Sequence, residues 1–161
     1  MTQYPIFIDF ECSSPDEDGF PIAVCWSLPD GQVKSTLIAP DDQWLSSNNH
    51  LFDDERIDLD DLMLHGVSPL AVVREMQADI DADTIYSDTL GEDGHWLDML
   101  FSAYEIEPTF QIEPASSLYE QSFEHWQDLK QQWLEEQGLD AYQSEANVIA
   151  MLNLHQQLGG S

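Results

Sequence analysis

The N-terminal quarter of the chain alternates between short apolar runs and polar turns. The runs at residues 4–10, 21–28 and 33–39 are too short for typical helices and are rich in β-branched and aromatic residues, so they predict strands. Pro29-Asp30-Gly31, between the second and third runs, is a tight-turn sequence. The pattern predicts a three-stranded antiparallel meander.

Apolar residues recur at helical spacing in much of the remaining chain, where Ser68 and Pro69 also provide an N-cap and a first helical residue. Residues 40–61 are acidic and irregular, and predict a surface segment with short helical turns. The order of elements indicates an α/β fold in which a mixed five-stranded sheet carries helices on both faces. The predicted helices cover residues 69–79, 91–104, 116–137 and 141–157, and the further strands cover 84–87 and 108–113.

The composition is that of one folded domain. The chain has 161 residues, of which 42% are hydrophobic, and this is enough for a core. We expect a single domain over residues 1–158 and a frayed end at 159–161. No apolar stretch is long enough to span a membrane, and we expect no signal peptide. Cys12 and Cys25 are too few for a disulfide scaffold, so the sequence favours a reducing, cytoplasmic location.

The chain is strongly acidic. Its formal net charge of −28 comes from 32 acidic residues against Lys34, Arg56, Arg74 and Lys130. This balance argues against a broad basic surface for nucleic acid. The charge is consistent with a saline cytoplasm, with selection for solubility, or with a surface that imitates a polyanion. If the surface imitates a polyanion, the expected partner is a basic protein.

The first predicted strand ends in two carboxylates, Asp9 and Glu11. Residues two apart in a strand point to the same face, so these carboxylates lie side by side and repel unless a proton or a cation lies between them. Hard oxygen ligands of this kind suit Mg²⁺ or Mn²⁺. A polar end to the strand, without a metal, is the alternative interpretation.

Four motifs follow one another along the chain. They are an apolar strand ending in Asp-x-Glu, a β-hairpin, a His-Gly-Val-Ser stretch before a helix, and an Asp that precedes an aromatic–apolar pair by three residues. The segments are Ile6-Phe7-Ile8-Asp9-Phe10-Glu11-Cys12-Ser13, residues 21–40, His65-Gly66-Val67-Ser68, and Tyr86-Ser87-Asp88 followed by Asp93-Gly94-His95-Trp96-Leu97. In this order they resemble the motifs of the DEDD superfamily of 3′–5′ exonucleases, which has a ribonuclease-H-like fold.

The last motif departs from the family pattern. The family has a His, then four residues, then an Asp at the head of the last helix, and here Asp140 and Glu145 stand in those two places. Asp140 is a weaker base than His unless its pKa is raised, and it also suits the alternative role of a helix N-cap. Glu145 is one methylene longer than Asp and can still bind a metal.

The resemblance implies phosphodiester hydrolysis at single-stranded RNA or DNA ends with two Mg²⁺ or Mn²⁺ ions about 4 Å apart. Asp140 is the implied general base, and the implied substrate contacts are His65, Cys12 and Ser13. The implied metal ligands are Asp9, Glu11, Asp93 and Glu145.

Three functions stay open on these observations. The first is a 3′–5′ exonuclease, impaired by the changes in its last motif. The second is a catalytically degenerate binding or regulatory module, which is favoured by the missing His and by the scarcity of the basic residues that neutralise phosphates. The third is an acidic mimic of nucleic acid that binds a basic protein. The sequence also leaves a homodimer open.

Overall fold

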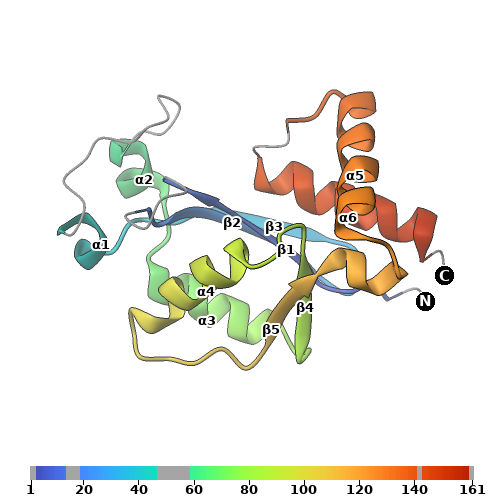
Figure 1. Ribbon diagram of the computed structural model, residues 1–161. Coiled ribbons are helices and arrows are strands. Elements are labelled where there is room, and N and C mark those ends of the chain that lie inside the picture. Colours follow the sequence, from blue (N-terminus) through green and yellow to red (C-terminus); the bar gives the residue numbers. More distant parts are fainter. Residues whose placement is uncertain (1–2, 14–18, 47–58, 141–142, 160–161) are drawn as a thin grey trace.

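The computed structural model describes residues 3–13, 19–46, 59–140 and 143–159 (Figure 1). The strands are β1 (Phe7–Cys12), β2 (Pro21–Ser27), β3 (Val33–Leu37), β4 (Thr84–Ser87) and β5 (Gln111–Pro114). The helices are α1 (Asp42–Ser46), α2 (Leu59–His65), α3 (Pro69–Asp79), α4 (Glu92–Ser102), α5 (Phe123–Gln137) and α6 (Ser144–Leu158), with a short 3₁₀ helix, η1 (Ala115–Tyr119).

The five strands form one mixed sheet in the order β3-β2-β1-β4-β5. β1 pairs antiparallel with β2, which pairs antiparallel with β3, so the predicted meander is confirmed. β4 lies parallel to β1, and β5 lies parallel to β4. Because β1 and β4 are parallel neighbours, their carboxyl ends meet at the same edge of the sheet.

The sheet separates two apolar cores, and the predicted α/β architecture with helices on both faces is confirmed. Ile8 and Phe10 of β1 pack into the core formed with α3 and α4. Phe7 points the other way and packs with residues of α5 and α6. Figure 1 shows α3 and α4 on one side of the sheet and α5 and α6 on the other. The alternation of β1 therefore directs Asp9, two residues after Phe7, toward α6.

The segment predicted as one helix over residues 116–137 is divided. It contains most of η1, then Glu120 in the left-handed conformation with φ of 55°, and then α5. α5 begins where the Ser122 hydroxyl accepts a hydrogen bond from the His125 N–H at 3.1 Å, which is an N-cap that apolar periodicity does not reveal. It ends, as predicted, at Gly138, whose φ is 68°.

Two other predicted segments extend into parts that the structure leaves undescribed. The acidic segment at 40–61 contains α1 and the start of α2, while residues 47–58 lie outside the described residues. The last helix begins at Ser144 rather than at residue 141, and residues 141–142 also lie outside them. Within the described parts of the chain, no helix has the length and apolarity needed to cross a bilayer.

The His-Gly-Val-Ser stretch has a packing role that requires glycine. A Cβ atom on Gly66 would lie 2.3 Å from the Leu62 carbonyl oxygen and 2.6 Å from the Ala39 nitrogen. This close approach lets Val67 form a parallel bridge with Ile38, just beyond β3. The Ser68 hydroxyl then accepts a hydrogen bond from the Ala71 N–H at 3.3 Å and caps α3, as the sequence predicts.

Candidate metal centre

Three aspartates gather where the carboxyl ends of β1 and β4 meet the start of α4. One carboxylate oxygen from each of Asp9, Asp88 and Asp93 lies within 4.8 Å of the others. All three side chains are buried, with exposed fractions of 6%, 6% and 2%. This is the only such group of potential metal ligands among the described residues.

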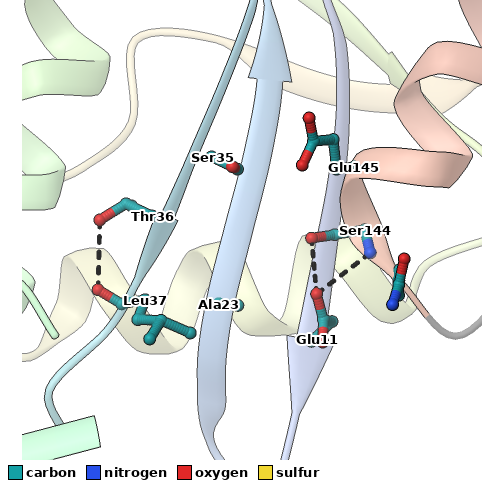
Figure 2. A pocket seen from close by; sticks show the side chains of 8 residues that line it. Glu11, Ala23, Ser35, Thr36, Leu37, Ser144 and Glu145 are labelled. Carbon is teal, nitrogen blue, oxygen red and sulfur yellow. Dashed lines mark hydrogen bonds between the residues drawn. The ribbon is translucent and has the colours of Figure 1, made fainter. Parts of the chain in front are cut away.

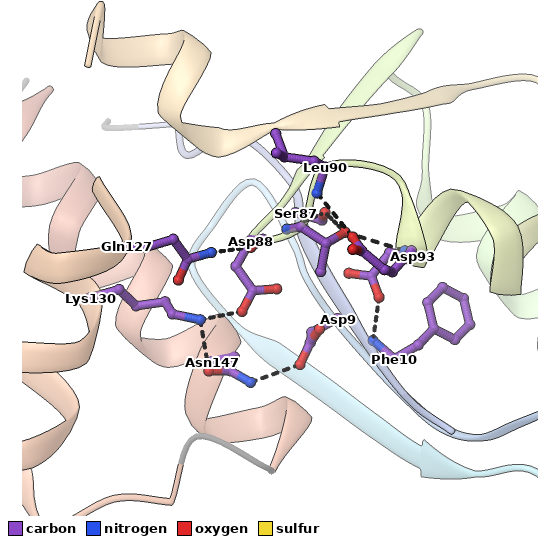
Figure 3. Close-up of polar contacts among 11 residues, drawn as sticks. Asp9, Phe10, Ser87, Asp88, Leu90, Asp93, Gln127, Lys130 and Asn147 are labelled. Carbon is purple, nitrogen blue, oxygen red and sulfur yellow. Dashed lines mark hydrogen bonds and ion pairs between the residues drawn. The ribbon is translucent and has the colours of Figure 1, made fainter. Parts of the chain in front are cut away.

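The backbone around α4 fixes the position of Asp93. The Phe10 N–H donates to Asp93 Oδ1 at 3.3 Å, which ties the start of α4 to β1. Thr89 Oγ1 accepts a hydrogen bond from the Asp93 N–H at 3.2 Å and lies 3.0 Å from Ser87 Oγ. The turn from β4 into α4 is therefore closed by its own hydroxyl groups, and it presents Asp88 and Asp93 to the same space (Figure 3).

A lysine and an asparagine contact two of the three carboxylates, those of Asp88 and Asp9, from α5 and α6. Lys130 of α5 forms an ion pair with Asp88 Oδ2 and donates to Asn147 Oδ1 at 3.2 Å. Asn147 of α6 in turn donates from Nδ2 to Asp9 Oδ2 at 2.9 Å. The Gln127 side chain donates to the Asp88 carbonyl oxygen. Figure 3 shows this continuous chain of contacts from α5 through α6 to β1.

The site is electrostatically incomplete without a cation or protons. Burial, followed by the charges of Asp88 and Asp93, raises the pKa of the Asp9 carboxyl well above its ordinary value. Burial and the charge of Asp88 raise the pKa of Asp93 to about 8. Three carboxylates and one ammonium group leave two negative charges, which one divalent cation would balance.

The donor atoms fit one hard divalent cation. Asp88 Oδ1 and Asp93 Oδ2 are buried and have no hydrogen-bond partner, although buried polar atoms are normally satisfied. Both are carboxylate oxygens, the ligand type that Mg²⁺ and Mn²⁺ prefer. Together with Asp9 they offer an all-oxygen site for a single ion, whose identity the donor set alone leaves open.

Glu11, predicted as a metal ligand, is bound to the protein itself. Its Oε2 accepts hydrogen bonds from the Ser144 N–H at 3.1 Å and from the Ser144 hydroxyl at 2.8 Å (Figure 2). Glu145 is exposed, and it lines a cavity of about 400 Å³ together with Glu11, Ala23 and Thr36. The structure thus brings together Asp9 and Asp93 of the predicted ligand set, and it places Glu11 and Glu145 outside the group that they form with Asp88.

The other predicted site residues lie apart from this group. Asp140 is half-buried, and its carbonyl accepts from the Gln143 N–H at 3.1 Å. His65 is exposed at the end of α2, with its Nε2 3.6 Å from Asp61 Oδ1. Cys12 packs against the α3–α4 core, and the buried Ser13 hydroxyl accepts from the Phe20 N–H at 3.0 Å. Among the described residues, the three-aspartate group includes no histidine.

Sequence reasoning missed the residues that complete the centre, although each left a signal. Asp88 directly follows β4, whose carboxyl end lies beside that of β1. Lys130 stands at helical spacing between Trp126 and Leu134, which are both fully buried, so a charged side chain falls on the apolar face of α5. Asn147 lies one turn after Ser144, on the same face of α6.

Comparison with known proteins supports the fold. A scan against protein-family models finds no match, and a search of curated proteins finds none either. Solved structures do match. E. coli Exonuclease I in complex with a dA16 oligonucleotide aligns with a TM-score of 0.63 at 10% identity, over 95% of this chain and 40% of that chain. The same enzyme with a dT13 oligonucleotide gives a TM-score of 0.64 at 12% identity, over 95% and 41%.

A second protein supports the same conclusion. The structure of the yeast NOT1 MIF4G domain co-crystallised with CAF1 aligns with a TM-score of 0.62 at 11% identity, over 96% of this chain and 80% of the matched chain. The ribonuclease-H-like fold of the DEDD exonucleases, which the sequence motifs implied, is therefore confirmed. The chain spans about two fifths of the matched Exonuclease I chain.

Proposed function

We propose that this protein is an exonuclease-fold binding module that holds one divalent cation and does not perform two-metal hydrolysis. The observation that carries this proposal is the bond from Lys130 to Asp88 in the carboxylate centre. Two-metal hydrolysis needs ligands for two cations about 4 Å apart. Here a protein ammonium group contacts one of the three carboxylates, and Glu11 is bound to Ser144.

Asp9, Asp88 and Asp93 would hold the cation. When bound, the cation would coordinate an oxygen of a phosphate or of another acidic group. Asn147 orients Asp9, and the Phe10 N–H orients Asp93. General-base catalysis usually contributes about 10²–10⁴-fold to rate, and the three-aspartate group has no histidine for this task among the described residues. Asp140 lies outside the group and is no substitute on this arrangement.

The charge of the chain favours a basic protein as the partner. Nucleic-acid binding depends on cationic groups that neutralise phosphates. Lys130 is buried, and Lys34 is bound to Glu75 at 2.8 Å and to Asp79 at 2.7 Å. Arg74 is exposed, and Arg56 lies outside the described residues. A chain with a net charge of −28 suits an arginine-rich surface far better than a nucleic-acid strand. We also infer a cytoplasmic location, because the two cysteines of the chain are too few for a disulfide scaffold.

Slow hydrolysis of single-stranded nucleic-acid ends with one metal ion is the second candidate function. The two unpartnered oxygens of Asp88 and Asp93 favour it, as does the fold shared with Exonuclease I, which was crystallised with oligonucleotides. In this case the bound cation would act as a Lewis acid. The cavity beside Glu11 would lie next to the reacting end of the nucleic-acid strand.

A nuclease assay separates the two candidates. Single-stranded DNA and RNA with labelled ends are incubated with Mg²⁺ or Mn²⁺ and either the wild-type protein or Asp9→Asn. We expect no nucleotide release that depends on Asp9. Release by the wild type that disappears in Asp9→Asn overturns the proposal and establishes hydrolysis. An arginine-rich peptide, titrated at low and high salt, tests the partner: we expect salt-sensitive binding, and no binding of single-stranded DNA under the same conditions.

A further inference from the structure

We infer that Lys130 is a built-in cation of the carboxylate centre, which limits the centre to weak binding of a single divalent ion. The inference rests on the proposed function, because it concerns the same three aspartates. The ammonium charge of this one residue of α5 distinguishes the site from a two-metal centre. Lys130 is thus a positioning and affinity-setting residue.

The place of Lys130 in α5 is the first observation. Trp126, Lys130 and Leu134 follow one another at four-residue spacing along one face of the helix. All three are buried, and Lys130 has an exposed fraction of 5%. Lysine is almost never buried to this degree unless its charge is paired. The side chain of Lys130 is therefore stabilised inside the protein by a paired negative charge, that of Asp88.

The contacts of Lys130 are the second observation. Its ammonium group bonds to Asp88 Oδ2 and to Asn147 Oδ1, so it touches one carboxylate directly and approaches a second through Asn147. Of the two carboxylate oxygens of Asp88, Oδ1 has no hydrogen-bond partner. An incoming metal ion therefore meets an Asp88 carboxylate that already shares its charge with a cation.

The balance of charge is the third observation. Asp9, Asp88 and Asp93 carry three negative charges when ionised, and the tethered ammonium group of Lys130 cancels one of them. A positive charge a few ångströms away also repels a divalent ion directly. Unlike a second metal ion, this cation cannot exchange with solvent or respond to metal concentration. Removal of its charge should therefore strengthen metal binding.

The test compares Lys130→Met with Lys34→Met. Both changes remove one lysine charge and keep a similar apolar stem, but Lys34 pairs with Glu75 and Asp79, away from the centre. Mn²⁺ binding is measured by calorimetry with the full chain at high salt, which suppresses diffuse binding to surface carboxylates. We expect Lys130→Met to bind Mn²⁺ at least about tenfold more tightly than the wild type, with Lys34→Met unchanged within about twofold.

Stability gives a second readout that does not depend on activity. Without its ammonium partner Asp88 is an unpaired buried charge, so we expect a lower melting temperature for Lys130→Met in EDTA and recovery on addition of Mn²⁺. If this variant is unfolded in EDTA, the readout is its circular dichroism during a Mn²⁺ titration. Refolding with Mn²⁺, but not with NaCl at matched ionic strength, supports the inference, and no refolding overturns it.

The outcomes separate this inference from the proposed function. Equal Mn²⁺ affinity for folded Lys130→Met and wild type would show that Lys130 has a structural role only. Asp9-dependent hydrolysis by the wild type overturns the proposed function whatever the affinities are. If the wild type binds no ion and Lys130→Met binds one, the result supports opposition of the metal by the Lys130 charge, but it overturns the binding of one ion by the wild type and with it the proposed function.

Discussion

Ser144 donates both its main-chain N–H and its hydroxyl to the same oxygen of Glu11, at 3.1 Å and 2.8 Å. This contact joins the first turn of α6 to the end of β1. The sequence predicts Glu11 as a metal ligand, but these two hydrogen bonds occupy its Oε2. A metal ion could bind that oxygen only if the hydrogen bonds broke or if the oxygen served both Ser144 and the metal. Glu11 is therefore a link between two elements, while Asp9 faces the metal centre.

The first prediction separates these two carboxylates. Glu11→Gln keeps an oxygen that accepts from Ser144, so we expect Mn²⁺ affinity to change by less than about threefold. Asp9→Asn removes a carboxylate of the centre itself, and we expect an affinity loss of more than about tenfold, or 1.4 kcal/mol. Calorimetry on both variants makes the comparison, and an equal loss in the two would show that Glu11 is a ligand.

The second prediction concerns pH and follows from the raised pKa of Asp93. An unfolded Asp titrates near 3.9, whereas in the fold the pKa of Asp93 is about 8. Between these values the folded state keeps a proton that the unfolded state has released. The free energy of unfolding that this proton contributes is therefore fully present below the pKa of the unfolded Asp. It is lost as the pH rises toward the pKa of Asp93 in the folded protein.

Asp93→Asn removes this loss. In EDTA we expect its free energy of unfolding to increase relative to wild type as the pH rises from about 4 to 8, by up to about 1.4 kcal/mol per pH unit. Urea denaturation at a series of pH values measures the difference. Asp98→Asn, an exposed position on the same helix, is the control and should show no such increase. A constant difference for Asp93→Asn would contradict the electrostatic description of the centre.

The third prediction concerns the amide that bridges Lys130 and Asp9. Asn147→Asp replaces the amide that donates to Asp9 with a fourth carboxylate. The hydrogen bond is lost, and the new carboxylate repels that of Asp9. We expect the metal-free protein to lose about 1–3 kcal/mol of stability and Mn²⁺ to restore it. Thermal denaturation with and without Mn²⁺ measures both effects.

The matched control for that experiment is Asn153→Asp on the same helix, where the side-chain amide donates to the Ile149 carbonyl oxygen at 2.9 Å. This variant should show no recovery specific to Mn²⁺. If Asn147→Asp were as stable as wild type in EDTA, the bridging role of Asn147 would be refuted.

The fourth prediction tests the packing of the His-Gly-Val-Ser stretch. Gly66→Ala would place a Cβ atom 2.3 Å from a backbone oxygen, and we expect a loss of more than about 2 kcal/mol. Gly94→Ala is the control, because it lies in α4 with nothing within 4 Å of the added carbon. This change should stabilise the protein by about 0.5–1 kcal/mol. Urea denaturation compares the two, and a neutral Gly66→Ala would contradict the close approach to Ala39.

The fold could be predicted because its signals are local. Short apolar runs separated by turn residues predicted the meander, helical spacing predicted the helices, and the order of these elements predicted a mixed sheet with helices on both faces. The divided segment at 116–137 was missed because its break depends on the Ser122 cap and on Glu120 in a left-handed conformation. Neither feature disturbs the apolar periodicity.

The site could be predicted only in part because it depends on long-range packing. Asp9 and Asp93 were predicted as ligands from their motifs, and the structure places their carboxylates in one group. Glu145 was chosen from the spacing of a family motif, but the start of α6 at Ser144 sets which side chains face β1. Lys130 enters the centre through the docking of α5 against α6, a relationship that no spacing along the chain encodes.

The most direct test of the central claim is the number of Mn²⁺ ions that the wild type binds at sites that depend on Asp9. It is measured by calorimetry at high salt and repeated on Asp9→Asn. A centre that combines three aspartates with Lys130 predicts one ion per chain, lost in the variant. Two ions per chain, both lost in Asp9→Asn, would show that a two-metal centre is intact and would contradict the proposal.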